Sequence, residues 1–212
     1  MDRIVDNKRY IWYSSLSSEL KKIYKKEIFH FFYQLIFEYR GFYEWYNNLF
    51  DKKCNLKPER EIIICEVDYT IAGEDILKRN SLETKICTLR VSNRYRNQGI
   101  AHQLMELSFE QLGTDHPMFT LHKNKLPQFK PIFDYYGFKV EQSQKHYYGL
   151  FNTELVYNGC LPKKIFLIDK IKIWDIERIY EDFLMSGLRS FEAYFEAWEK
   201  YGDINKIIHS CV

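Results

Sequence analysis

The sequence lacks the cysteine and histidine patterns of a metal site or a disulfide framework. Its five cysteines are an odd number, are widely spaced and form no Cys-x-x-Cys pair, and no histidine lies at metal-ligand spacing from them. We therefore expect no bound metal. Cys65 and Cys87 lie inside apolar runs, where cysteine behaves as a small buried hydrophobic residue. Reduced thiols of an intracellular protein are the simplest interpretation.

Long hydrophobic runs and a strong net charge are absent as well. No uninterrupted apolar run approaches the roughly 18 residues that a transmembrane helix needs, and residues 1–6 lack the apolar core of a signal peptide. We therefore expect a cytoplasmic protein with no membrane partner. The formal net charge is only +2, so the overall composition does not favour nucleic acid as a partner.

The chain nevertheless has enough apolar residues for one domain with its own core. Its 212 residues are 46% hydrophobic, which allows a single domain with a helical appendage. Aromatic residues make up 17%, and their frequent helical spacing favours core and interface packing over a base-stacking surface.

Periodicity predicts a mixture of strands and helices. Apolar residues recur every three or four positions after Ser17 and Ser18, either of which can cap a long helix. We interpret four lysines on the opposite face of this helix as a solvated surface, with polyanion binding as the alternative. Further helices are expected at about 42–49, 99–112 and 127–136, and two more within 160–212. The expected strands are Tyr10–Tyr13, Glu61–Val67, Thr70–Leu77, Thr84–Val91, Met118–Leu121, Phe138–Gln142 and Leu150–Tyr157.

A short turn, Arg96-Asn97-Gln98-Gly99-Ile100-Ala101, joins the strand Thr84–Val91 to the following helix. A helix start leaves several backbone N–H groups without intrahelical partners and carries about half a positive charge. Gly99 would let an anion approach the backbone closely. The turn therefore predicts an anion site such as one for phosphate.

This turn resembles the acyl-CoA-binding motif of the GNAT superfamily of N-acetyltransferases, Gln/Arg-x-x-Gly-x-Gly/Ala. Arg96, Gly99 and Ala101 fill its three specified positions. The segment Ile132–Phe138 is similar to the helix-to-strand segment of the family that ends in Gly-Phe. The resemblance covers roughly Tyr10–Gly159 and implies an α/β (α+β) GNAT fold, with a mixed, mostly antiparallel central sheet of six or seven strands flanked by helices.

The resemblance also implies a division of the chain. Residues 1–159 would form an acyl-CoA-binding domain, with a strand and the acceptor-side helices in 10–57 and the core in 60–143. Residues 160–212 lie beyond the resemblance. Their two amphipathic patterns predict a helical C-terminal extension, packed on the domain or at a homodimer interface.

Acetyl-CoA is the co-substrate that the resemblance implies. The backbone of Leu89, Arg90 and Val91 would hold the pantetheine arm and the thioester carbonyl, where an N–H group stabilises the oxyanion. The side-chain amide of Asn124 would contact the pantetheine. The pyrophosphate would lie on the N–H groups of Asn97, Gln98, Gly99, Ile100 and Ala101, with the charge of Arg96 beside it.

Attack on the thioester needs a deprotonated amine, and a general base is the usual solution. Glu83 is the candidate, because in a regular strand it shares a face with Leu89 and Val91. Some family members carry the base nearer the middle of this strand, at the position of Lys85. The alternative for Glu83 is a strand-end ion pair with Lys78 or Lys85.

The general acid is less clear from the sequence. Many family members have a tyrosine four residues before the Gly-Phe pair, and this chain has Phe133 there. Tyr136 is the candidate for protonating the CoA thiolate. Packing of Tyr136 into the core, with solvent as the proton source, is the alternative.

The function that the resemblance implies is that of an N-acetyltransferase using acetyl-CoA to acetylate a primary amine of an unidentified acceptor. A non-catalytic acyl-CoA-binding or scaffolding module is one alternative. A toxin-like acetyltransferase acting on aminoacyl-tRNA is another, which the helix lysines permit and the near-neutral charge disfavours.

Overall fold

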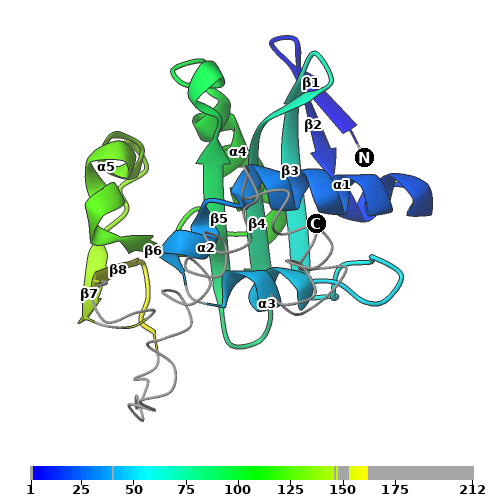
Figure 1. The fold of residues 1–212 in the computed structure, drawn as a ribbon. Helices are drawn as coiled ribbons and strands as arrows, with labels where there is room; N and C mark the ends of the chain where they lie inside the picture. Colours follow the sequence, from blue (N-terminus) through cyan, green and yellow to red (C-terminus); the bar gives the residue numbers. More distant parts are fainter. Residues whose placement is uncertain (1, 40, 146, 148–152, 162–212) are drawn as a thin grey trace, which may run out of the picture. The chain divides into compact units, whose positions relative to one another are not determined.

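One eight-stranded sheet forms the centre of the protein in the computed structural model, which describes residues 2–39, 41–145, 147 and 153–161. Its strands lie in the order β1-β2-β3-β4-β5-β6-β8-β7 (Figure 1). All neighbours are antiparallel except β5 and β6, which are parallel. The strands are β1 (Asp2–Val5), β2 (Lys8–Trp12), β3 (Arg60–Val67), β4 (Thr70–Arg79), β5 (Thr84–Val91), β6 (Met118–His122), β7 (Val140–Lys145) and β8 (Thr153–Tyr157).

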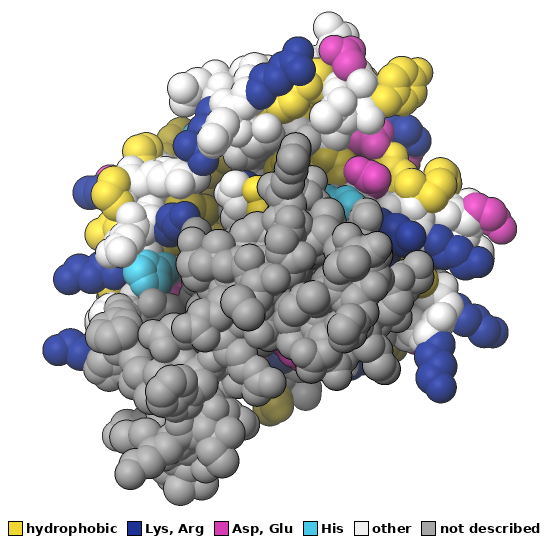
Figure 2. All heavy atoms as spheres, viewed as in Figure 1, with side chains coloured by type: hydrophobic (Ala, Val, Ile, Leu, Met, Phe, Trp, Pro, Cys, Tyr) yellow, Lys and Arg dark blue, Asp and Glu magenta, His cyan; other side chains and the backbone are white. Residues whose placement is uncertain are grey.

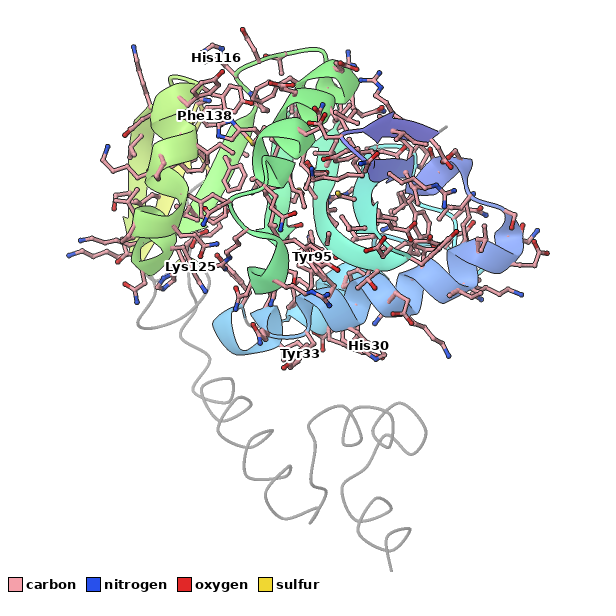
Figure 3. The ribbon with its side chains drawn as sticks, turned by 90° about the horizontal axis from the view of Figure 1, so that it is seen from above. His30, Tyr33, Tyr95, His116, Lys125 and Phe138 are labelled. Atoms are coloured by element: carbon pink, nitrogen blue, oxygen red, sulfur yellow. The ribbon has the colours of Figure 1, made fainter. Side chains whose placement is uncertain are left out.

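Helices cover both faces of this sheet. Figure 3 shows α1, with the short helices that follow it, on one face and α4 and α5 on the other. The α-helices are α1 (Ser18–Phe32), α2 (Leu35–Glu38), α3 (Phe42–Asn47), α4 (Ile100–Leu112) and α5 (Leu126–Tyr135). Short 3₁₀ helices span Tyr13–Ser15, Asn93–Tyr95 and Lys123–Lys125.

The predicted fold class is confirmed, with one strand more than expected. β1 pairs with β2 through a tight turn at Asp6 and Asn7, whose φ values are +47° and +61°. Two successive residues with positive φ are typical of a type I′ hairpin turn, for which Asp and Asn are favoured residues. The Asp-Asn pair was therefore a usable hairpin signal that the sequence analysis missed.

Two apolar clusters attach the helices to the sheet. α1 begins as predicted, with the Ser17 hydroxyl accepting a hydrogen bond from the Leu20 N–H at 3.3 Å. Ile28 and Phe32 of α1 are fully buried against the sheet together with residues of α3. On the other face, Leu104 of α4 and Phe133 of α5 belong to a second cluster.

Strand β5 departs from regular pairing on both of its sides. On the β4 side, Ile76 lies opposite Thr88 whereas Leu77 lies opposite Ile86, so that Cys87 is an extra residue. Such a β-bulge reverses the alternation of side chains beyond it. On the β6 side, pairing stops after Lys85 and Ile86, and the rest of β5 has no strand partner there among the described residues.

Within the described ranges, no helix combines the length and apolarity needed to cross a membrane. The predicted extension at 160–212 lies outside the described residues, apart from Cys160 and Leu161. The same holds for residues 150–152 of the last expected strand, which in the structure begins at Thr153.

Candidate functional site

The turn before α4 has the geometry of an open anion cradle. Gly99 is the N-cap residue of α4 with φ +77°, and Asn97 also has a positive φ of +59°. The first helical hydrogen bond runs from the Gln103 N–H to the Gly99 carbonyl at 3.0 Å, so the N–H groups of Ile100 and Ala101 precede the helical ladder. A Cβ added at Gly99 would meet no atom within 4 Å. A phosphate therefore has room against the backbone here.

The side chains around the cradle suit an anion as well. Arg96 is exposed and forms no ion pair with any residue that the structure describes. Gln98 is also exposed, and its side chain reaches only the Arg94 carbonyl at 3.5 Å. The Arg96 charge is therefore free for a ligand.

The cradle lies at the end of the unpaired edge of β5. Leu89, Arg90 and Val91 come after the last β5–β6 pair, Ile86 with Phe119. Figure 1 shows α2 in front of the gap between β5 and β6. The structure thus brings the three predicted backbone positions together with the turn, on the side of β5 that faces the gap.

Asn124 lies across this gap, in the 3₁₀ helix that follows β6. Its backbone N–H donates a hydrogen bond to Nδ1 of His122 at 3.2 Å. Because β5 and β6 are parallel, the 3₁₀ helix after β6 and the turn after β5 lie at the same end of the sheet. Asn124 is therefore positioned at the end of the gap where the turn lies.

Gly73 of β4 supports the turn from beneath, and sequence reasoning missed it. A Cβ at this position would lie 2.8 Å from Cγ2 of Ile100 and 3.2 Å from Cδ1 of Leu104. Both contacts are shorter than side-chain packing normally permits, so only glycine allows α4 to approach β4 this closely. A glycine inside an otherwise apolar strand pattern was the available signal.

A Gly73→Ala variant should weaken acetyl-CoA binding although no ligand atom needs to touch the new methyl group. The methyl would push the first turns of α4 away from the sheet, and overpacking of this kind costs about 1–3 kcal/mol. We expect a lower Tm in thermal unfolding and a raised Kd in calorimetry. An unchanged Kd would contradict a role of this contact in holding the turn.

Glu83, the predicted general base, directly precedes β5. Its carboxylate forms an ion pair with Lys78 Nζ in the turn between β4 and β5. The bulge at Cys87 also removes the argument from alternation, because Ile86 and Leu89 both enter the cluster beneath α4. A residue at 83 therefore does not share a face with Leu89 and Val91.

The Tyr136 hydroxyl is engaged with α4. It donates to the His102 carbonyl at 3.2 Å and lies 3.4 Å from Oε1 of Glu106. Burial, and then the Glu106 carboxylate, raise the pKa of this hydroxyl. Phe133, at the position where many family members have tyrosine, is 1% exposed and packs on Phe119 and Tyr157. These contacts match the packing role that was the alternative for Tyr136.

The opposite face of the sheet holds buried polar groups that sequence reasoning did not single out. Glu74 of β4 and Glu154 of β8 are 0% and 1% exposed. The Tyr39 hydroxyl, just after α2, lies 3.5 Å from Oε1 of Glu154. Arg90 Nη2 donates to Oε1 of Gln34 at 2.8 Å.

Among the described residues, no group of three His, Cys, Asp or Glu side chains could hold a metal.

A lysine surface lies on the same side as α1. Figure 2 shows Lys and Arg side chains along the edge of the molecule where α1 and the loop after α3 lie. Lys21 Nζ donates to Oδ1 of Asn55 in that loop at 3.1 Å, which links the two segments. The surface consists of Lys21, Lys22, Lys25, Lys26, Lys52, Lys53 and Lys57.

A comparison with known protein families agrees with this arrangement of sheet, turn and helices. The profile of a family described as an acetyltransferase (GNAT) domain matches residues 32–154, more than half of the chain. The chain belongs to the GNAT family. The matched segment includes the unpaired edge of β5, the turn, α4 and α5. The protein is therefore an acetyltransferase.

Solved structures show the same fold at low identity. A GNAT family acetyltransferase from Elizabethkingia anophelis with acetyl-CoA bound is 15% identical, with a TM-score of 0.50 over 72% of this chain and 97% of that one. The ribosomal-protein-S18-alanine N-acetyltransferase from Escherichia coli is 13% identical, with a TM-score of 0.50 over 74% and 99%.

Nourseothricin acetyltransferase is 16% identical, with a TM-score of 0.43. The match covers 47% of this chain and 64% of that protein. No curated protein matches the sequence. The fold is thus shared with the proteins from Elizabethkingia anophelis and Escherichia coli, whereas the acceptor is a matter for proposal.

Proposed function

We propose that the protein uses acetyl-CoA to acetylate a primary amine. The observation that carries the proposal is the open Gly99 cradle at the end of the unpaired β5 edge. The cradle and Arg96 would hold the pyrophosphate, and Asn124 would contact the pantetheine arm. A backbone N–H among Leu89, Arg90 and Val91 would stabilise the oxyanion as the amine attacks the thioester.

The CoA thiolate needs no dedicated acid in this proposal. A thiol has a pKa near about 8.5, so its anion is a tolerable leaving group that solvent can protonate. The Tyr136 hydroxyl, held on α4 with a raised pKa, is not assigned this step. The transfer is therefore chemically feasible with solvent as the proton source.

Two measurements test the proposed function. Calorimetry should detect acetyl-CoA binding by the purified full chain, and mass spectrometry should detect acetylated products after incubation with a library of metabolites and peptides. Binding without any product would instead favour the non-catalytic module. Growth arrest on expression, relieved by mutating the turn, would favour an acceptor on aminoacyl-tRNA, for which the lysine surface is the supporting feature. Absence of acetyl-CoA binding would contradict the proposal.

A Glu83→Gln variant should retain acetyltransferase activity. The carboxylate of Glu83 is occupied by Lys78 in a hairpin turn, and a partly exposed ion pair of this kind contributes about 0–1 kcal/mol to stability. We expect the rate of CoA release to stay within about twofold of the parent, since general-base catalysis typically contributes about 100-fold or more. A hundredfold loss in this variant would restore Glu83 as the base.

A further inference from the structure

A buried carboxyl group on β4 has no partner that would explain its burial. Glu74 is 0% exposed, and neither of its carboxyl oxygens has a hydrogen-bond partner among the described residues. The hydroxyl oxygen of Thr88, on the neighbouring strand, is likewise buried without one. Burying an ionised carboxylate without a partner is costly, and such groups in native proteins call for an explanation.

Glu74 lies beside the unpaired edge of β5, on the face of the sheet away from α4. It is directly opposite Arg90 in the β4–β5 register, and Arg90 is one of the positions on the unpaired edge. The next residue, Asp75, accepts a hydrogen bond from the Ser108 hydroxyl of α4. Because successive side chains of a strand alternate, Glu74 faces α1 and α3. Glu74 therefore lies next to Arg90 on this face of the sheet.

The surroundings of Glu74 change the pKa of its carboxyl group. Burial, and then the neighbouring Asp75, raise the pKa of Glu74 well above its usual value, and the cation of Arg90 lowers it. α3 contributes Tyr46, whose pKa is raised by burial and then by Glu74. β3 places Ile64 opposite, and the buried residues of α1 in this cluster are Ile28 and Phe32. A carboxylate with a raised pKa is a stronger base than an ordinary one, as proton abstraction requires.

We propose that Glu74 receives the ammonium group of the acceptor and takes its proton, directly or through one water molecule. The inference rests on the proposed function and names the substrate class as cationic primary amines. An N–H bond of the ammonium breaks and an O–H bond forms on Glu74. The freed lone pair forms the C–N bond as the C–S bond breaks. The second N-bound proton passes through solvent to the CoA thiolate, and Glu74 returns its proton to solvent.

Arg90 supports this assignment from the rim of the site. Its guanidinium lies 5.4 Å from the centre of the Phe31 ring and donates to Gln34, so its position is fixed by the segment that covers the edge. From there its charge favours the ionised form of Glu74. Arg90 is therefore a positioning residue in this proposal, acting through the carboxylate.

The test compares Glu74→Gln with the parent across pH, using the full chain, acetyl-CoA and a panel of putrescine, tyramine and a lysine-containing peptide. In the parent, kcat/KM should rise as Glu74 ionises and then level off. In Glu74→Gln it should fall about 100-fold near pH 7 and rise with pH until the free amine itself deprotonates near about pH 10. Glu74→Asp should restore part of the activity.

Asp75→Asn is the matched control, because Asp75 is equally buried on the same strand but faces α4. It should keep the rise and the plateau of the parent pH profile, with the rise moved to lower pH, because the Asp75 charge raises the pKa of Glu74. Glu74→Gln and a second variant, Glu74→Leu, should keep or raise the Tm, since each removes a buried charge that has no hydrogen-bond partner among the described residues. A residue with a purely structural role would lower the Tm instead.

The outcomes separate this inference from the proposed function. If the parent binds acetyl-CoA and acetylates an amine while Glu74→Gln keeps the parent profile, the role of Glu74 is overturned and the proposed function stands. If Glu74→Gln and Glu74→Leu unfold at clearly lower temperature, Glu74 is structural and the inference is wrong. If the parent binds acetyl-CoA but acetylates none of the cationic amines in the panel, the substrate class named here is wrong, whereas absence of acetyl-CoA binding would overturn the proposed function as well.

Discussion

A Gly99→Glu variant should lose acetyl-CoA binding and keep its fold. The new carboxylate would project into the space where the pyrophosphate is expected, because a Cβ at this position meets no protein atom within 4 Å. Opposed like charges cost several kcal/mol, so we expect the Kd in calorimetry to rise by roughly 100-fold or more. The turn is exposed at this residue, and the apolar clusters are untouched.

Gly137→Glu is a closely matched control for this experiment. Gly137 has φ +70°, compared with +77° at Gly99, and a Cβ there also meets nothing within 4 Å. Both variants therefore carry the same added charge and a similar cost for placing a side chain at positive φ. Gly137 precedes Phe138, which Figure 3 shows at the end of α5 opposite Lys125. Equal loss of affinity in both variants would mean that the cradle is not where the pyrophosphate binds.

The fold and the cradle were predictable because their signals are local. The spacing of apolar residues defined β5 to the residue at Thr84–Val91, and Ser17 marked the start of α1. Gly99 was singled out because glycine lets an anion approach the backbone, and in the structure it has the positive φ that glycine adopts readily. Each of these features depends on residues close together in the chain.

The proposed position of the general base depends on strand register, which the sequence alone does not give. The prediction of Glu83 assumed a regular strand, and the single extra residue at Cys87 reverses the alternation that it used. Glu74 gives no local signal, because acidic side chains are rarely fully buried and the sequence of β4 does not say that both of its faces are covered. Only the packing of α1 and α3 over one face and of α4 over the other buries both.

A Phe133→Ala variant should lose about 3–5 kcal/mol of unfolding free energy, the usual cost of removing a buried phenylalanine ring. Phe133 is 1% exposed, and its ring centre lies 5.1 Å from that of Phe119 and 4.4 Å from that of Tyr157. It also stacks on Phe138 at 5.2 Å with an angle of 7° between the rings. The ring therefore joins α5 to β6, β8 and the segment before β7. Urea unfolding monitored by circular dichroism measures the loss.

Two further variants at and near this position separate packing from chemistry. Tyr135→Ala, on the same helix but 71% exposed, should change the unfolding free energy by about 0.5 kcal/mol or less. Phe133→Tyr should lower stability, because its hydroxyl would enter an apolar cluster, where an unpaired hydroxyl costs about 1–3 kcal/mol. It should not raise the rate of acetyl transfer. A faster Phe133→Tyr enzyme would show that a hydroxyl at position 133 can protonate the departing thiolate. The phenylalanine of this chain would then occupy the position of a general acid.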